Sequence, residues 1–142
     1  MKEIRVQRLD SRAKLPIRAH LEDAGLDLHA LESGVIGAGG RLVVSTGIAI
    51  AVPEGHVGLI LDRSGLATKH GITNLGGVID AGYRGEWKVI MHNTSDEPYE
   101  VAAGERIAQI LIVPIVLPQV CEVSELDVTM RGEGGFGSTG KK

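Results

Sequence analysis

The sequence predicts an all-β domain, a jelly-roll-like β-barrel or sandwich with one short helix and a flexible glycine-rich C-terminal arm. Three observations lead to this fold class. Apolar residues occur in many short runs that are rich in β-branched side chains. Gly, Pro, Asn and Asp separate these runs at the intervals typical of strands and turns in all-β domains. Only one segment has helical character.

In chain order, the apolar runs predict strands at Ile4–Leu9, Asp27–Leu31, Arg41–Val52, His56–Asp62, Trp87–His92, Arg106–Val116 and Gln119–Val123. Turn signals between them lie at Gly37–Gly40, Pro53–Gly55 and Asn93–Pro98. The helical segment is Ser64–His70. We expect Ser64 to cap its first turn and Gly71 to end it.

The segment Arg106–Val116 is apolar at nearly every position, a pattern typical of a strand buried on both faces. In a chain of 142 residues, another subunit covers the second face more easily than the chain's own sheet, so we expect an oligomer. From Ser124 onward the apolar content falls and glycine becomes frequent. We therefore expect a β domain over residues 1–123 and an arm over residues 124–142.

The composition limits the classes of partner. The formal net charge is −3, whereas proteins that bind a nucleic-acid backbone usually present a basic face, so no nucleic-acid partner is expected. No apolar run approaches the roughly 18 residues of a membrane span. The start of the chain lacks the apolar stretch of a signal peptide, which predicts a cytoplasmic protein without a membrane partner. Cys121 is expected to be a small buried hydrophobic residue, and the histidines lack metal-ligand spacing.

Two segments have the residue types that bind anions or metal ions. Asp27, between two leucines, points to the opposite face of its strand. It either orients a hydrated metal ion or is a turn carboxylate. Arg63, Ser64 and Gly65 open the helical segment, where they either bind an anion or form a capped turn with a surface arginine.

The stretch Asn74–Glu86 is typical of a β-hairpin whose exposed backbone can hydrogen-bond a flat ligand edge-on. Asp80 can hold a water beside a ligand against which Tyr83 packs, and a carboxylate acting as general base contributes about 10²–10⁴-fold to rate. The alternative is a solvated hairpin with a turn aspartate. Gln109 lies among apolar neighbours and needs a partner, either a ligand phosphate or the backbone, because an unpaired buried amide costs about 1–3 kcal/mol.

The tail Arg131–Gly140 is rich in glycine and carries the only phenylalanine of the chain. In one interpretation it is a lid, in which Arg131, Ser138 and Thr139 hold phosphates while Phe136 stacks on a base. In the other it is a disordered linker with an isolated aromatic residue.

Five segments, AGLDL, RSGLA, GGVIDAGYRGE, ERIAQ and RGEGGFGSTG, occur in the order and spacing of the five motifs of the trimeric dUTPase family, which the chain resembles over nearly its whole length. The resemblance implies a jelly-roll homotrimer with three active sites, each assembled from all three subunits. The implied reaction is the hydrolysis of dUTP to dUMP and pyrophosphate, which lowers dUTP and supplies dUMP for thymidylate synthesis. The implied cofactor is Mg²⁺, bound mainly through the substrate triphosphate.

The resemblance also implies roles for individual residues. Asp27 would hold waters of the Mg²⁺, Gln109 would contact the α-phosphate region, and Asp80 would be the general base for in-line attack of water on the α-phosphorus. Tyr83 would pack under the deoxyribose, and Lys88 would approach the ligand. The remaining implied contacts are phosphate binding by Arg63, Ser64 and Gly65, uracil recognition by Asn74 and the backbone of Gly77, Val78 and Ile79, and closure of the arm by Arg131, Phe136, Gly137 and Ser138.

One residue departs from the family pattern. The family more often has proline before Arg-Ser-Gly, whereas this chain has Asp62, which we expect to point to solvent because a carboxylate is unfavourable beside phosphates. The alternatives to the dUTPase function are a deaminase of the related dCTP deaminase type and a catalytically silent nucleotide-binding module.

Overall fold

The structure is a computed structural model of the chain, and it describes residues 3–136. The first half of the chain forms β1 (Arg5–Arg8), β2 (Leu26–His29), β3 (Gly34–Ile36), β4 (Arg41–Ser45), β5 (Ile48–Ala51), β6 (His56–Leu61) and the helix α1 (Ser64–His70). The second half forms β7 (Ile72–Leu75), β8 (Val78–Ile79), β9 (Lys88–Asn93), β10 (Tyr99–Val101) and β11 (Arg106–Pro114). A mostly β domain with one short helix was the prediction. Within the described residues, no helix is long and apolar enough to cross a membrane.

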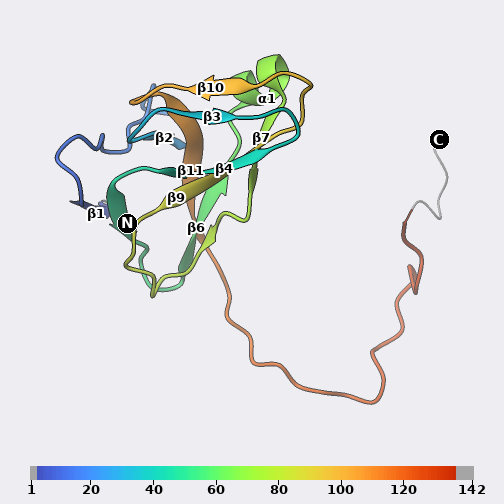
Figure 1. The fold of residues 1–142 in the computed structure, drawn as a ribbon. Helices are drawn as coiled ribbons and strands as arrows, with labels where there is room; N and C mark the ends of the chain where they lie inside the picture. Colours follow the sequence, from blue (N-terminus) through green and yellow to red (C-terminus); the bar gives the residue numbers. More distant parts are fainter. Residues whose placement is uncertain (1–2, 137–142) are drawn as a thin grey trace.

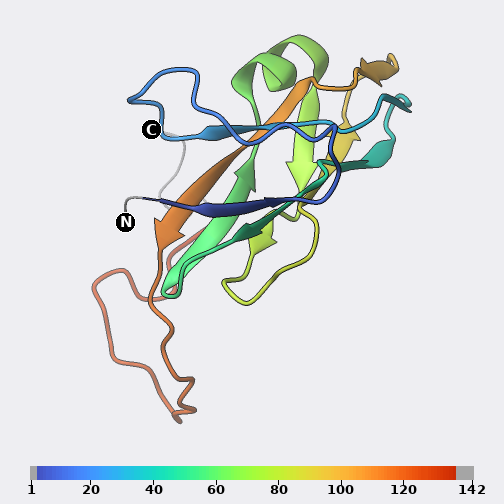
Figure 2. The ribbon, with the colours of Figure 1, turned by 90° about the vertical axis from the view of Figure 1, so that its left-hand side faces the viewer.

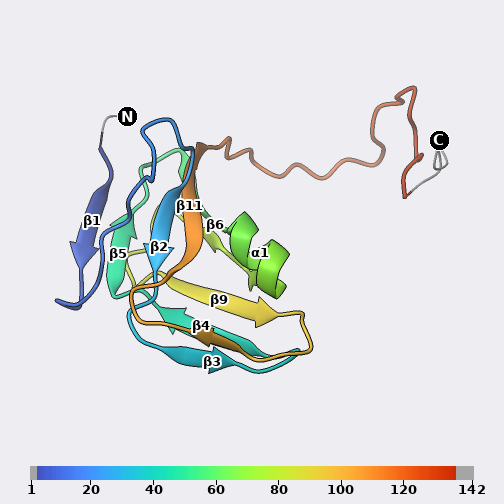
Figure 3. The same cartoon turned by 90° about the horizontal axis from the view of Figure 1, so that it is seen from above.

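The strands form two main antiparallel sheets, ordered β2-β11-β6-β8 and β4-β9-β7, and two smaller pairs, β1-β5 and β10-β3. Figure 3 shows the main sheets as separate layers, and Figure 1 shows α1 beside the end of β6 and the start of β7. In the turned view of Figure 2, β6 and β11 run side by side. Because α1 joins β6 to β7, it carries the chain from one main sheet to the other.

The core lies between these layers and is built from aliphatic residues around one tryptophan. Trp87 is 0% exposed, and a Cβ on Gly58 would overlap its ring. Strand β9 shows the alternation that a sheet facing a core requires, since Val89, Met91 and Asn93 are buried while Lys88 is exposed. The other fully buried large aliphatic residues are Leu28, Ile36, Ile48, Ile50, Ile72, Ile107 and Ile110.

The predicted strand Arg41–Val52 is divided into β4 and β5 by a corner at Gly47, which has a φ of 69°. The carbonyl of Gly47 accepts a hydrogen bond from the Leu9 N–H at 2.8 Å, and its N–H donates to Glu86 Oε1 at 2.9 Å. The chain therefore changes partner here: β4 pairs with β9, and β5 pairs with β1. A single continuous strand was the wrong prediction, because the corner depends on partners remote in sequence.

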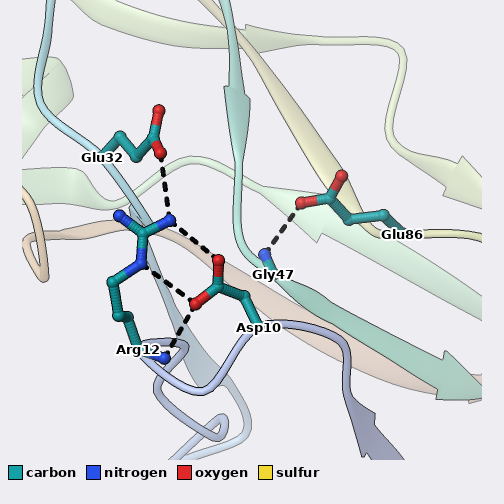
Figure 4. Close-up of polar contacts among 5 residues, drawn as sticks. All are labelled: Asp10, Arg12, Glu32, Gly47 and Glu86. Atoms are coloured by element: carbon teal, nitrogen blue, oxygen red, sulfur yellow. Dashed lines mark hydrogen bonds and ion pairs between the residues drawn. The ribbon is translucent and has the colours of Figure 1, made fainter.

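A small ion cluster of Asp10, Arg12 and Glu32 lies near the Gly47 corner, as Figure 4 shows. Arg12 bonds both oxygens of Asp10, with Nε to Oδ1 at 3.0 Å and Nη2 to Oδ2 at 2.8 Å. These hydrogen bonds favour the charged carboxylate and lower the pKa of Asp10 to about 2. On the other side of the corner, Glu86 joins the segment before β9 to Gly47.

The end of the chain differs from the expected strands. Strand β11 stops at Pro114, and the described residues beyond it have no strand, so the predicted strand Gln119–Val123 is wrong for the single chain. Figures 1 and 3 show this segment running away from the β layers. Cys121 is exposed there, contrary to its expected burial. An isolated apolar run can form a strand only if it has a neighbour to pair with.

The helix begins as predicted at Ser64 but is capped differently. Arg63 occupies the N-cap position, with extended backbone and no side-chain cap hydrogen bond. Ser64 is therefore the first helical residue, and its predicted capping role is wrong. At the other end, Gly71 adopts the left-handed conformation with a φ of 64° and ends the helix as predicted.

Candidate active site

Charged side chains from β2, from the N-cap of α1 and from β11 meet where β6 ends. We call Asp27, Arg63, Ser64, Gly65, Arg106 and Gln109 the arginine cluster. Asp27 Oδ1 accepts from Arg63 Nε at 3.1 Å, and Asp27 Oδ2 accepts from Arg106 Nη1 at 3.2 Å. The Asp27 side chain is only 13% exposed, so it needs these partners. Strand β11 brings them together because it lies between β2 and β6.

The arginine cluster lines a polar cavity of about 190 Å³, to which Ala19 and Asp23 also contribute. Two guanidinium groups face one clamped carboxylate, so the cluster itself has a surplus of positive charge. Arginine forks match the oxygens of phosphates and carboxylates. The structure brings the predicted site residues Asp27, Arg63 and Gln109 to one cavity, and it adds Arg106, which was not predicted. Its signal was the ERIAQ segment, in which only Gln109 was given a role.

The charges of the cluster influence the pKa of His29, which lies two residues after Asp27 on β2 and is 6% exposed. Burial lowers the pKa of His29, and the cation of Lys14 lowers it further, while Asp27 opposes this shift. Arg106 and Arg63 act in the same direction as Lys14. The lowered pKa favours the neutral form of His29, chiefly because the side chain is buried.

Gln109 takes its partner from the backbone, one of the two alternatives that the sequence left open. Its Nε2 donates to the carbonyl of Asp62 at 2.8 Å. A Cβ on Gly25 would overlap the amide oxygen of Gln109, so the glycine of the AGLDL segment gives Gln109 its room. The side chain is therefore held in place at the wall of the cavity.

Asp62 does not point to solvent, which corrects the expectation. Its Oδ1 accepts the N–H of Asn74 at 2.6 Å, and its Oδ2 accepts the hydroxyl of Thr73 at 2.7 Å. Both partners lie on β7. The carboxylate is thus directed to the neighbouring sheet and is not among the residues that line the arginine-cluster cavity.

The second group of predicted residues surrounds the connection between β8 and β9, and we call residues 80–86 the tyrosine loop. Tyr83 N–H donates to the Asp80 carbonyl at 3.0 Å, which closes a turn. The Tyr83 hydroxyl donates to the Glu86 carbonyl at 3.0 Å, and a Cβ on Gly85 would overlap the Tyr83 ring. The ring is therefore folded onto its own loop, with 44% of the residue exposed.

The tyrosine loop lines a cavity of about 270 Å³. Its lining residues are Val43, Val78, Ile79, Asp80, Tyr83, Glu86, Lys88 and Ile90. Asp80 is exposed at this cavity, and Lys88 Nζ lies 3.6 Å from Glu86 Oε2. Carboxylate, ammonium and aromatic groups therefore line one partly apolar cavity, an arrangement suited to a polar organic ligand.

The segment Asn74–Glu86 is not a closed hairpin, which corrects the prediction. Strand β7 pairs with β9, and β8 pairs with β6, so the two strands belong to different sheets. Gly77 makes the crossing with a φ of 96°, where a Cβ would lie 2.6 Å from the Ile60 carbonyl oxygen. The crossing leaves β8 at the edge of its sheet and Asn74 Oδ1 buried without a hydrogen-bond partner among the described residues.

The two cavities lie apart on the chain. They share no lining residue. Figures 1 and 2 show α1 near one end of β6 and the yellow-green connection between β8 and β9 toward the other. Between Gly58, which pairs with Ile79, and Arg63 the chain advances roughly 15 Å at strand spacing.

The described part of the arm, residues 124–136, contributes to neither cavity of its own chain. Arg131 Nε donates to the Gly134 carbonyl at 2.7 Å, and Phe136 is fully exposed. Gly137 and Ser138, the other predicted arm contacts, lie outside the described residues. The structure therefore places the arginine-cluster residues at one cavity and the tyrosine-loop residues at another. Arg131 and Phe136 line neither cavity.

Comparison with known proteins identifies the family. A family model described as dUTPase matches residues 11–140. The chain belongs to the dUTPase family. A deoxyuridine 5'-triphosphate nucleotidohydrolase of Corynebacterium glutamicum is 52% identical over 141 residues, covering 97% of this chain and 95% of that protein. The protein of the same name from Paramecium bursaria Chlorella virus 1 is 49% identical and covers 99% of both chains.

Solved dUTPase structures share the fold. The Staphylococcus bacteriophage 80alpha dUTPase with dUPNHPP is 34% identical, with a TM-score of 0.92 over 99% of both chains. A mutant dUTPase from phage phi11 of S. aureus, described with a coordinated structural Mg(II) ion, is 30% identical, with a TM-score of 0.82 over 87% of this chain and 98% of that one. The predicted family resemblance and fold class are confirmed.

Proposed function

We propose that this member of the dUTPase family, a dUTP diphosphatase, hydrolyses dUTP to dUMP and pyrophosphate with Asp80 as general base and the arginine cluster as phosphate site. The observation that carries the proposal is the division of the residues into two chemically distinct cavities. One is polar and rich in arginine, which suits a triphosphate. The other combines a carboxylate, a lysine and an aromatic ring, which suits a nucleoside.

The carboxylate of Asp80 accepts a proton from a water molecule, whose oxygen forms a bond to the α-phosphorus. The bond between that phosphorus and the bridging oxygen of the β-phosphate breaks in line with the attack, and pyrophosphate leaves. Arg63 and Arg106 stabilise the charge that develops on the phosphate oxygens. Gln109, held by the Asp62 carbonyl, contributes an oriented amide at the same cavity.

The residues present fit a metal ion carried in by the substrate. No group of three or more His, Cys, Asp or Glu side chains in residues 3–136 forms a metal-ligand set. Mg²⁺ typically keeps several waters and binds through one or two carboxylates together with substrate phosphates. Asp27, with Asp23 in the same cavity, meets that requirement through water. A bound Mg²⁺ would neutralise phosphate charge, while Asp27 also orients Arg63 and Arg106.

Asn74 and β8 are proposed to recognise the uracil ring. The N–H and C=O groups on the open side of an edge strand are free to pair with a base edge. Asn74 Oδ1, buried without a partner among the described residues, offers a further acceptor. The backbone of Gly77, Val78 and Ile79 would read the base, and Tyr83 would pack under the deoxyribose. Lys88 is the proposed cationic contact on this side.

The complete active site is proposed to form between subunits of a homotrimer. The arginine cluster and the tyrosine loop of one chain line separate cavities, so a single nucleotide that uses both groups requires two chains. Arg131, Phe136, Gly137 and Ser138 would come from the arm of a further subunit. Exposed apolar residues along the chain after β11, including Val116, Leu117 and Val120, support a partner subunit.

The test is pyrophosphate release from dUTP, dTTP, dCTP and UTP, each with and without Mg²⁺. Rapid release from dUTP alone, dependent on Mg²⁺, would support the reaction and the base recognition together. Equal release from all four nucleotides would contradict base recognition by Asn74 and β8. Ammonia release from dCTP, or dUTP binding without turnover, would contradict the proposed reaction.

A further inference from the structure

Asp62 contacts both parts of the proposed machinery. Its carboxylate accepts hydrogen bonds from the Asn74 N–H and the Thr73 hydroxyl, at 2.6 and 2.7 Å. Its carbonyl accepts the Gln109 amide at 2.8 Å, and the next residue in the chain is Arg63. One residue at the end of β6 is therefore bonded to β7 through its side chain and to the arginine cluster through its backbone.

The Asp62 carboxylate accepts a hydrogen bond from a backbone N–H of β7 that no neighbouring strand accepts. Among the described residues, strand β7 is the edge of its sheet and pairs only with β9. The Asn74 N–H donates to Asp62, on the side where no strand lies. A buried or half-buried N–H without a partner is costly, so the side chain of Asp62 takes the place of a neighbouring strand at this point.

A second tether holds the other end of the same segment. Ile60 N–H donates to the Gly77 carbonyl at 2.8 Å, and the pairs Gly58–Ile79 and Leu59–Val78 continue the contact along β6. Both ends of the segment between Asn74 and Ile79 are thus hydrogen-bonded to β6 or to Asp62, which follows β6. Asp62 provides the fixation nearest to Asn74.

The direction of the Asn74 side chain depends on this fixation. Its Oδ1 has no hydrogen-bond partner among the described residues, so no bond of its own fixes that oxygen. The backbone of Asn74 sets where the amide points, and the Asp62 carboxylate holds that backbone. A displacement of about 1 Å is enough to weaken a preorganised contact substantially.

We propose that Asp62 is a positioning residue for base selection, which holds Asn74 and the start of the β7–β8 segment in register for the uracil edge. The proposal rests on the proposed function, in which this segment reads the base. It requires side-chain hydrogen bonds to both the Asn74 N–H and the Thr73 hydroxyl, but no negative charge. Asparagine at this position can accept from the Asn74 N–H and donate to the Thr73 hydroxyl, whereas alanine or the proline frequent in the family cannot replace the side-chain bonds.

The experiment compares Asp62→Ala, Asp62→Asn and Thr73→Val with Asp96→Ala, an exposed carboxylate without a hydrogen bond among the described residues. KM and kcat are measured for dUTP and for dCTP. Asp62→Ala should raise KM for dUTP about tenfold, which corresponds to the net contribution of one hydrogen bond. The preference for dUTP over dCTP should fall by a similar factor while kcat changes little. Asp62→Asn should restore both values, and Thr73→Val should give an intermediate change.

A purely structural role would lower thermal stability without changing base preference. A folded Asp62→Ala variant with the KM and base preference of the wild type would therefore overturn the proposal. If Asp62→Ala does not fold, Thr73→Val decides the question, and an unchanged KM and preference in that variant would overturn it. Failure of the proposed function is distinguishable, because the wild-type protein would then not hydrolyse dUTP.

Discussion

At the scale of single residues, Asp27 is bound by two arginines from different elements, one at the start of α1 and one on β11. Each arginine remains partly exposed, with 26% of the Arg63 side chain and 47% of the Arg106 side chain accessible. Their guanidinium groups have more donors than the carboxylate uses, so they can bind phosphate oxygens without leaving Asp27. Asp27 thus orients both cations as well as facing the proposed metal position.

The Asp80→Asn variant should lose activity but still bind the substrate. The proposed base is exposed at the tyrosine-loop cavity, and asparagine has nearly the same shape but cannot take a proton. We expect kcat for dUTP to fall about 10²-fold or more while the Kd for a non-hydrolysable dUTP analogue stays near the wild-type value. Single-turnover kinetics and equilibrium binding measure the two quantities. A near-normal kcat would remove Asp80 from the role of base.

Tyr99 should make the folded protein sensitive to alkaline pH. Burial raises the pKa of Tyr99, and its hydrogen bond to Glu105 raises it further. Because the pKa is raised in the folded state, the contribution to stability is present below the unfolded value of about 10 and is lost as the pH rises above that value. Thermal unfolding between pH 8 and 11 should therefore show a steeper loss of Tm in the wild type than in Tyr99→Phe. Parallel curves for the two proteins would contradict this assignment.

At the scale of elements, the crossing from β7 to β8 determines the shape of the proposed base site. Strand β7 pairs with β9 and strand β8 pairs with β6, so the connection between them passes from one main sheet to the other. Gly77 is required there for two reasons, its φ of 96° and the Ile60 carbonyl beside it. The Glu86 bond to Gly47 and the Trp87 N–H bond to the Ile48 carbonyl, at 2.9 Å each, hold the far end of the tyrosine loop.

Gly77→Ala should destabilise the protein more than a comparable change at Gly39. Both glycines have positive φ, which costs roughly 1–2 kcal/mol for a residue with a Cβ, but a Cβ on Gly39 would meet nothing within 4 Å. The difference between the two variants isolates the clash with Ile60. We expect a lower free energy of unfolding for Gly77→Ala in urea titrations, together with a raised KM for dUTP. Equal destabilisation by the two variants would show that the crossing can relax.

The sequence predicted well those elements whose residue pattern lies within the element itself. Runs such as His56–Asp62 and Trp87–His92 alternate, and Gly71 marks the end of α1, so their patterns were sufficient. Strands β3 and β10 are three residues long and exist because they pair with each other, across more than sixty positions of sequence. The partner of Gln109 and the direction of Asp62 also depend on remote backbone, and no local pattern contains that information.

At the scale of the whole molecule, the arginine cluster and the tyrosine loop line separate cavities of one chain, and in the proposed trimer each chain therefore donates these groups to different active sites. The motifs named part of the lining of each cavity, because the family resemblance singled out Arg63, Gln109, Asp80 and Tyr83. The motifs could not show that these residues lie at two separate cavities of one chain, because the distance between two motifs depends on how the strands pair in the folded sheets. Arg106 was overlooked for the same reason, since its partner Asp27 lies on another strand.

Mixing two inactive variants should restore activity. Arg63→Ala damages the arginine cluster, and Asp80→Asn damages the tyrosine loop. If every active site combines these groups from different chains, random trimers of the two variants should have roughly a quarter of their sites free of both changes. Refolding an equal mixture and measuring pyrophosphate release provides the test, with each variant refolded alone as control. No recovery in trimers that do mix would mean that one chain supplies both groups.

Ending the chain at Met130 should leave a folded oligomer with poor turnover. The described part of the arm beyond Met130 makes hydrogen bonds only within the arm, so its removal takes no support from the β layers. The loss should appear in kcat/KM for dUTP, because Arg131 and Phe136 are proposed to close over the ligand of another subunit. Size-exclusion chromatography and circular dichroism establish that the truncated protein is folded. Full turnover in the truncated protein would show that the arm beyond Met130 is not required for catalysis.

The burial of Trp87 gives the protein a built-in spectroscopic probe. It is the only tryptophan of the chain, it is 0% exposed, and it follows directly on the tyrosine loop at the entrance to β9. Because the indole is buried and its Nε1 has no hydrogen-bond partner among the described residues, its fluorescence should be emitted at short wavelength. Unfolding would shift that emission to the red. Ligand-induced movement of the tyrosine loop would change its intensity without any added label.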